Sequence, residues 1–529
     1  PTEILDDVTI EADRKHIEYK IDKKIVNVSQ DIGSQGGSAV DVLENTPSVQ
    51  TDIEGNVMLR GSSSFTVLID GKPTPLEGSE ALQQIPASSI ENIEIITNPS
   101  AKFDPDGVAG IINIVLKQEE KKGINGNVNL AYGSFNAFNG DFLINARTGK
   151  FNFFVGGNYS DRVSEGTNES LSARFLGDST FVTDVDGTGS WGHNGYNARA
   201  GLDYFMTDKD IITVSGEYGA RGFSRGGTSD NTLFYSDAED KPFTNAISDP
   251  WYYSNDVNFD VTSKYYSGDL NYQHKFNNEG HDLQAYFMYS GSVKDETSGF
   301  NRFDTDADFN VLDGASEVKE QSVETGNTGR MRAKIDYTNP FSENGKFEAG
   351  YQFRNRIGLS DYEYQIWNGS VYVDDSTQFN DVDFNRQIHA SYATFTNQLW
   401  KFDYMLGVRG EYTKRDFTSN VLNKSWNYEK FDAFPTVHVS RKLKYEIQLQ
   451  ASYTSRIRRP RSWFLDPFRS KMDEYNYREG NPGLEPAYIN SFEFNAQKRF
   501  GSHFLALESF YRQTNNLFER ITYVDPTNP

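Results

Sequence analysis

The sequence predicts an antiparallel all-β transmembrane barrel preceded by a small α+β domain, and three observations lead to this fold class. Beyond about residue 120 the chain repeatedly alternates apolar and polar residues with a period of two. Short polar turns recur along the same stretch at wide intervals. The 529 residues include 30 Tyr, 38 Phe and 44 Gly although the mean hydropathy is −0.65, a composition typical of many strands and turns.

Charge and composition exclude several other classes. The chain has 52 basic and 75 acidic residues, so its net charge of −23 argues against a nucleic acid partner. It has no cysteine, which excludes disulfides, thiolate metal sites and cysteine nucleophiles. No run approaches the ~18 apolar residues that a membrane-spanning helix needs, which excludes a helical membrane protein.

Short helical and strand signals fill the first part of the chain, which we expect to end between Glu119 and Gly123. A short helix is predicted from Ser38, which can cap its first turn, to Glu44. Ser88 and Glu91 have the spacing of a capping box. These signals predict an α+β domain of roughly 100 residues, with strands at Val57 to Arg60, Phe65 to Asp70, Ile93 to Thr97 and Ile111 to Leu116.

One stretch of the second part illustrates the alternation. Phe402, Tyr404, Leu406, Val408 and Tyr412 fall on one face of a predicted strand, while Asp403, Met405, Gly407, Arg409 and Glu411 fall on the other. Such a strand has one apolar face and one wettable face.

The spacing of the turns favours a membrane barrel over a β-sandwich, which would show the same alternation. Sandwich strands are short, with turn signals every ~8 to 12 residues. Here the turns are 43 to 70 residues apart, which leaves room for a strand, a long loop and a returning strand, as in outer-membrane barrels. They lie at Thr148-Gly149-Lys150, Thr207-Asp208-Lys209, Asn277-Asn278-Glu279, Ser342-Glu343-Asn344, Trp400-Lys401, Lys442-Leu443-Lys444 and Gly501-Ser502.

Seven such turns predict 15 strands within this sequence. A spanning sheet must close, because an open edge in lipid leaves backbone groups unsatisfied. Either the C-terminal strands are missing from this sequence or other chains complete the barrel. We favour missing strands, since large transporters with a plugged lumen have 22 strands.

Two sets of motifs resemble one known family. In order and spacing, the first set is similar to the plug domain of TonB-dependent outer-membrane receptors over about 90 residues. It comprises Leu59-Arg60-Gly61, Val67 to Pro73, Ile85 to Ile95, Asn98 to Asp104 and Gly107 to Ile114. The second set resembles outer-membrane β-barrel family proteins, and it comprises Phe431 to Pro435, Arg458-Arg459-Pro460 and Asn476 to Pro486.

The resemblance implies an organisation in three parts. Residues 1–30 would hold a TonB-box-like segment and a leader, residues 31–120 an α+β plug inside the lumen, and residues 121–529 a barrel whose C-terminal strands are missing. It also implies the outer membrane of a Gram-negative bacterium as the location. No catalytic motif stands out, so we do not expect an enzyme.

The energy-coupling segment of such receptors, the TonB box, resembles the residues just before the plug, which are Leu5, Asp6, Asp7, Val8, Thr9 and Ile10. A short β-prone strip of this kind can add itself as a strand to a partner's sheet. On residues alone, a frayed terminal strand fits equally well, and the position before a plug favours the TonB box. The expected partner is the TonB energy-transduction complex.

Several residues of the plug motifs are candidates for its function. They are Arg60, Gly61, Asp70, Gly71, Lys72, Glu91 and Glu94. We expect plug arginines such as Arg60 to pair with inward-facing carboxylates of the barrel, although Arg60 could equally be an ordinary surface charge.

Two other clusters have weaker patterns. Asp304, Asp306 and Asp308 alternate as in a calcium loop, but Phe309 and Ala315 stand where an EF-hand needs Gly and Glu. A solvated loop is favoured, a calcium site of another kind stays open, and no other cofactor is expected. The basic cluster Arg456, Arg458, Arg459 and Arg461 could grip an anionic ligand, lipopolysaccharide phosphates or neighbouring acidic residues.

Two functions remain after the enzyme hypothesis is set aside. The favoured one is TonB-dependent active import of a scarce or bulky nutrient, such as a chelated metal, a vitamin, an oligosaccharide or a peptide. The alternative is a non-transport receptor or scaffold barrel within a larger outer-membrane assembly. Ligand-binding residues cannot be named, but specificity should lie in extracellular loops near 160–190, 222–256, 293–326, 360–384 and 456–488. Outer-membrane lipid and a surface lipoprotein are further expected partners.

Overall fold

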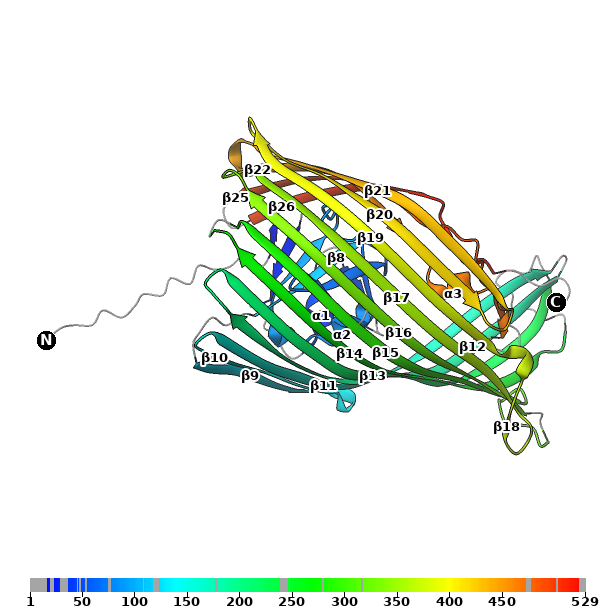
Figure 1. Ribbon diagram of the computed structural model, residues 1–529. Coiled ribbons are helices and arrows are strands. Elements are labelled where there is room, and N and C mark those ends of the chain that lie inside the picture. Colours follow the sequence, from blue (N-terminus) through cyan, green and yellow to red (C-terminus); the bar gives the residue numbers. More distant parts are fainter. Residues whose placement is uncertain are drawn as a thin grey trace.

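A long antiparallel sheet curves around a smaller α+β domain in the computed structural model (Figure 1). The structure describes residues 17–19, 23–28, 37–44, 46, 49–52, 55–74, 78–107, 109–117, 123–176, 179–237, 246, 248–277, 280–314, 317–471, 477–500 and 503–522. Among these residues no helix is long and apolar enough to cross a bilayer.

The small domain, called the plug from here on, has a mixed sheet with strand order β1-β2-β7-β8-β5-β6. Strands β5 and β8 run parallel, and the other neighbours are antiparallel. Apolar side chains fill its core, including the fully buried Leu59, Ile93 and Ile112. Its elements are β1 (Ile17–Tyr19), β2 (Lys24–Asn27), α1 (Ala39–Glu44), β3 (Val49–Thr51), β4 (Val57–Leu59), β5 (Phe65–Ile69), β6 (Lys72–Pro73), α2 (Ser79–Gln83), η3 (Ala87–Ser89), β7 (Ile90–Ile96) and β8 (Gly110–Leu116).

Two sequence predictions for this domain are wrong. Strands β1 and β2 lie within the predicted leader of residues 1–30, yet β2 pairs with β7 and all four of its residues are buried. The two apolar residues of β2, Ile25 and Val26, form too short a run to be recognised as a strand. Ser88 and Glu91 form no capping box either, because Glu91 lies in strand β7 and the Ser88 hydroxyl donates to Asp141 of the barrel.

The predicted helix start at Ser38 is confirmed. The Ser38 hydroxyl accepts a hydrogen bond from the amide of Val40, and Asp41 accepts one from the amide of Ser38. This reciprocal arrangement satisfies amides that a helix start leaves unpaired.

The large sheet contains 16 strands within the described residues, and 15 of them form one continuous path from β9 to β26, since β18 pairs beside that path. The 15 predicted strands are therefore confirmed. They are β9 (Gly123–Tyr132), β10 (Phe138–Thr148), β11 (Phe151–Leu176), β12 (Ser179–Phe205), β13 (Asp210–Asp237), β14 (Trp251–Lys275), β15 (Asp282–Asp304), β16 (Glu317–Pro340), β17 (Lys346–Trp367), β19 (Asn380–Leu399), β20 (Phe402–Ser419), β21 (Lys424–Lys442), β22 (Ile447–Arg458), β25 (Ala487–Phe500) and β26 (His503–Asn515).

Shorter elements lie in the connections. These are η4 (Ser134–Asn136), β18 (Tyr372–Asp374), η5 (Ser376–Gln378), η6 (Lys444–Glu446), α3 (Ser462–Leu465), β23 (Ser470–Lys471) and β24 (Tyr477–Arg478). The predicted turns at 148–150, 207–209, 342–344, 400–401 and 442–444 connect consecutive strands of the sheet, whereas Asn278-Glu279 and Gly501-Ser502 lie outside the described residues. Within the described residues no ladder joins β9 to β26, and closure with 22 strands stays a prediction.

Most residues predicted in extracellular loops lie instead in strands. Strand β13 has 28 residues, against the ~9 to 11 that cross a bilayer. Its ladder with β12 continues to Asp237 at its far end. The predicted loops were therefore mostly wrong, because polar residues on both faces do not prevent pairing once neighbouring strands are in register.

The two faces of the sheet differ as the alternation predicts. Leu406, Val408 and Tyr412 of β20 are exposed on the outer face, at 42 to 51%. Arg409 and Glu411 of the same strand are at most 1% exposed and face the plug. The wettable face is thus the one that surrounds the plug.

Candidate functional site

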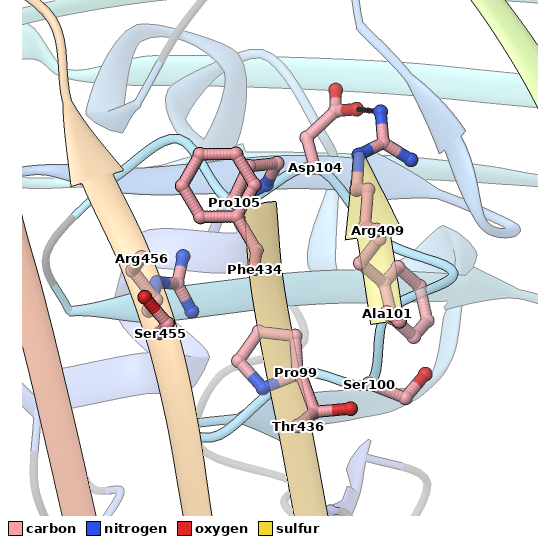
Figure 2. A pocket seen from close by; sticks show the side chains of 11 residues that line it. Pro99, Ser100, Ala101, Asp104, Pro105, Arg409, Phe434, Thr436, Ser455 and Arg456 are labelled. Carbon is pink, nitrogen blue, oxygen red and sulfur yellow. Dashed lines mark hydrogen bonds and ion pairs between the residues drawn. The ribbon is translucent and has the colours of Figure 1, made fainter. Parts of the chain in front are cut away.

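The plug meets the barrel wall through residues 98–107, which connect β7 to β8 and are called the seat segment here (Figure 2). Asn98, Ser100 and Ala101 are at most 7% exposed. A turn closes within the segment, where the amide of Phe103 donates to the carbonyl of Ser100. The turn directs the next carboxylates, Asp104 and Asp106, toward basic side chains of the barrel.

Asp104 binds three arginines from three barrel strands. Its carboxylate lies 3.1 Å from the guanidinium groups of Arg332 on β16, Arg354 on β17 and Arg409 on β20. Figure 2 shows the contact with Arg409. One plug carboxylate therefore fixes the segment against a wide part of the wall.

Asp106 and the barrel residue Glu411 extend this cluster. Asp106 lies 3.0 Å from Arg354 and 2.7 Å from Arg459, the first residue after β22. Glu411, which is fully buried, bonds Arg354, Arg409 and Arg459 at 2.7 to 3.0 Å. Each of these three arginines thus contacts Glu411 of the wall and at least one carboxylate of the plug, and Arg354 contacts both plug carboxylates.

Backbone pairing adds to the ion pairs. The amide of Gly107 donates to the carbonyl of Ile457, and the amide of Ile457 donates to the carbonyl of Pro105. Arg456 donates to the carbonyls of Asp106 and Gly107 at 3.1 and 2.8 Å. The ladder between β21 and β22 ends at the pair Thr436 and Thr454. Beyond that pair, β22 bonds the plug rather than β21.

The rest of the seat segment is held by smaller contacts. Asn98 donates to Ser452 and accepts from Thr454, both on β22. Lys102 lies 3.2 Å from Glu348 on β17. Ala101 lies opposite Gly407, where a Cβ atom would come within 2.9 Å of the Ala101 methyl group. The missing side chain at Gly407 therefore makes room for Ala101 of the seat segment.

Burial and charge act against each other on the seat carboxylates. Burial alone would raise the pKa of Asp104, but Arg354, Arg332 and Arg409 outweigh it and hold that pKa well below its usual range. Burial is likewise opposed at Asp106, where Arg459 and Arg354 lower the pKa. Both plug carboxylates are therefore ionised at neutral pH.

Among the predicted plug residues, Arg60 has the expected pairing. Its guanidinium binds Glu493 of β25, lies 3.6 Å from Glu508 of β26 and stacks over Phe510. Arg60 and Gly61 both have positive φ angles, 51° and 73°, in the turn after β4. The turn projects the Arg60 side chain from the plug sheet to the wall.

The other predicted plug residues do not meet in one site, and Asp70, Gly71 and Glu94 make contacts within the plug. Asp70 accepts from the amide of Leu116, and the amide of Gly71 donates to Asn113. Glu94 accepts from Lys23 at 2.6 Å. Lys72 lies 4.0 Å from Asp269 of the barrel, and Glu91 is half-buried in β7. The TonB-coupling candidates, Leu5 to Ile10, lie outside the described residues.

Two sequence candidates remain, the basic cluster and the aspartate loop, and only the basic cluster reaches this site. Arg456 and Arg459 of the basic cluster bind the plug, so lipopolysaccharide phosphates do not reach them. Asp306 accepts from the amides of Asp308 and Asn310 and closes a turn. Among the described residues no three acidic or imidazole side chains are placed to hold a metal ion.

Comparison with known proteins gives matches for both parts of the chain. Residues 23–111 match the family model described as the TonB-dependent receptor plug domain. Residues 274–529 match the model of the outer membrane protein beta-barrel family. A curated relative, a vitamin B12 transporter, BtuB, of Vibrio vulnificus, is 32% identical over 108 residues, which is 18% of each chain. The match thus spans less than a fifth of that relative.

Solved structures share the fold along nearly the whole chain. The ferric citrate transporter FecA has a TM-score of 0.58 at 13% identity, over 94% of this chain and 70% of its own. The ferripyoverdine receptor of the Pseudomonas aeruginosa outer membrane has a TM-score of 0.56 at 15% identity, over 93% and 63%. At these identities the likeness shows the fold alone.

Proposed function

Because this chain belongs to the TonB-dependent receptors of the Gram-negative outer membrane, we propose that it imports a scarce or bulky nutrient across that membrane. The nutrient would be a chelated metal, a vitamin, an oligosaccharide or a peptide. Related proteins are named as transporters of vitamin B12 and ferric citrate, which supports import without identifying the ligand of this chain.

The observation that carries the proposal is the polar seat of the plug. The plug lies inside the curve of the large sheet (Figure 1). In a closed barrel, solutes would pass only after part of the plug moves. Its contacts with the wall are ion pairs and hydrogen bonds at Asp104, Asp106 and Arg60. Water can replace such contacts one at a time, which suits a domain that must be held firmly and then partly displaced.

Energy for this displacement would come from the inner membrane. Leu5 to Ile10 would act as the TonB box, adding a strand to the TonB partner. A pull on this segment would first load β1 and β2, since they are the next elements along the chain. Strand β2 pairs with β7, and β7 leads directly into the seat segment. Lipopolysaccharide, a surface lipoprotein and a loop calcium ion stay predictions.

The experiment compares a strain carrying Val8→Pro with one carrying the matched control Asp7→Asn. Proline removes the amide that strand addition needs, whereas the control preserves it. Growth is measured in competition on limiting chelated iron, vitamin B12, oligosaccharides or peptides. Loss of fitness on one nutrient with Val8→Pro alone is expected. Equal fitness of both strains on every nutrient, with the protein in a stable complex with other proteins, would favour the scaffold function instead.

A further inference from the structure

The described parts of the connection between β22 and β25 fold back into the barrel. Residues 459–471 and 477–486 of this connection are called the lid here. Figure 1 shows its helix α3 inside the wall of the sheet. Leu465 of α3 is fully buried against Val382 and Phe384 of β19 and Phe417 of β20. The lid therefore packs on the inner face of this part of the wall.

The outer part of the lid is fixed to the wall by its own set of contacts. Lys471 lies 2.8 Å from Glu320 on β16, and its carbonyl accepts from Tyr362 on β17 at 2.5 Å. Asp466 accepts from Asn380 on β19, and Arg415 on β20 donates to the carbonyl of Leu484. These contacts do not involve the plug.

The base of the lid is fixed to the plug. Arg459, the first lid residue, bonds Asp106 of the seat segment and Glu411 of the wall, both at 2.7 Å. Its side chain is only 4% exposed. The two residues before the lid strengthen the junction, because Ile457 pairs with the backbone of the seat segment and Arg456 donates to its carbonyls. A displacement of the lid must therefore strain or break bonds to the plug.

We propose that the lid and Arg459 couple events on the outer side of the lumen to release of the seat segment. A ligand that displaces the lid from its contacts on β16, β17, β19 and β20 withdraws Arg459 from Asp106 and so weakens the hold of the wall on the seat segment. Arg459 is thus a positioning residue for transport. The proposal rests on the proposed transport function, but its test needs neither ligand nor TonB.

The test is hydrogen exchange on the full-length protein in detergent, with two variants that loosen the lid without touching its contacts with the plug. Lys471→Ala removes the outer ion pair with Glu320. Gly480→Val disrupts the lid from within, because a Cβ at this position would lie 2.6 and 2.7 Å from the carbonyl oxygens of Phe464 and Asp466. Lys294→Ala is the matched control, since Lys294 pairs with Glu296 on the wall strand β15, outside the lid contacts.

Both lid variants should accelerate exchange at least threefold in peptides from the lid and from the seat segment, and the control in neither. In an Arg459→Gln background, the lid variants should no longer change exchange in the seat segment, because the link is already cut. Faster exchange in the lid with an unchanged seat segment would overturn the coupling. Unchanged exchange in the lid with both variants would also overturn it, since the lid would then not move separately. Failure of nutrient uptake alone would count only against the proposed function.

Discussion

Replacing Asp104 with asparagine tests whether ion pairs hold the plug. Asn keeps the size of the side chain but removes the charge that faces Arg332, Arg354 and Arg409 at 3.1 Å. Breaking a buried ion pair from one side costs about 3 to 5 kcal/mol, because the partner charge is left unpaired. Arg354 and Arg409 keep their bonds to Glu411, so the lower value, about 3 kcal/mol, is expected.

A loss of about 3 kcal/mol corresponds to roughly a hundredfold increase in the opening equilibrium of the seat segment. Hydrogen exchange of residues 98–107 measures this directly, because exchange follows local opening. Glu429→Gln is the control, since Glu429 is an exposed carboxylate 3.8 Å from Lys414. Peptides from β7 and β8 should stay protected, which separates local release from unfolding of the plug. An increase of less than threefold in the seat segment would refute the role assigned to these ion pairs.

Three further predictions concern the pH dependence of the seat segment, the ion pairs of Arg60 and the space at Gly407. The pKa values of Asp104 and Asp106 are lowered in the folded protein, so both carboxylates stabilise the seat segment at any pH above their unfolded pKa of about 3.9. This stabilisation is lost as the pH falls through the folded pKa values. Protection of the seat segment from hydrogen exchange, corrected for the intrinsic exchange rate, should therefore stay constant from about pH 8 to 5 and decline only below about pH 4. Arg60→Lys should reduce the free energy of unfolding of the plug by about 1 to 2 kcal/mol, because a single ammonium group cannot replace the guanidinium that reaches both Glu493 and Glu508. Denaturant titrations monitored by hydrogen exchange would measure this loss. Gly407→Ala should cost about 1 to 3 kcal/mol of seat protection by crowding Ala101 and the Thr436 hydroxyl, whereas Gly268→Ala, with open space around it, should have no effect in the same assay.

The strand count could be predicted from sequence because both of its signals are local. Alternation along one strand, as from Phe402 to Tyr412, needs no knowledge of its neighbours. Turn residues such as Thr148-Gly149-Lys150 are likewise contiguous. The long ladders beyond the expected membrane zone were missed, because polar residues on both faces of a paired strand look like a loop.

The seat could not be predicted, because its partners are far apart in the chain. Asp104 lies 305 residues before Arg409, and Asp106 lies 353 residues before Arg459. Asp104 and Arg459 both stand within motifs that resemble the family, but nothing in one sequence pairs them. Arg60 was the exception, since an arginine projecting from a plug into a lumen has few partners other than inward carboxylates.

The chemistry of the seat follows from its need to open. The core of the plug is apolar, and burial of such surface gains about 25 cal/mol per Å², which is lost as a whole when the core opens. An apolar seat would therefore hold the plug by a contact that water cannot replace. Ion pairs behave differently, because each charge regains hydration when its partner leaves. Glu411 supports this release, since it keeps Arg354 and Arg409 paired on the wall after Asp104 and Asp106 have gone. The wall thus retains one carboxylate beside these arginines in the open state, which offsets part of their charge, lowers the cost of opening and leaves them placed for the plug to return.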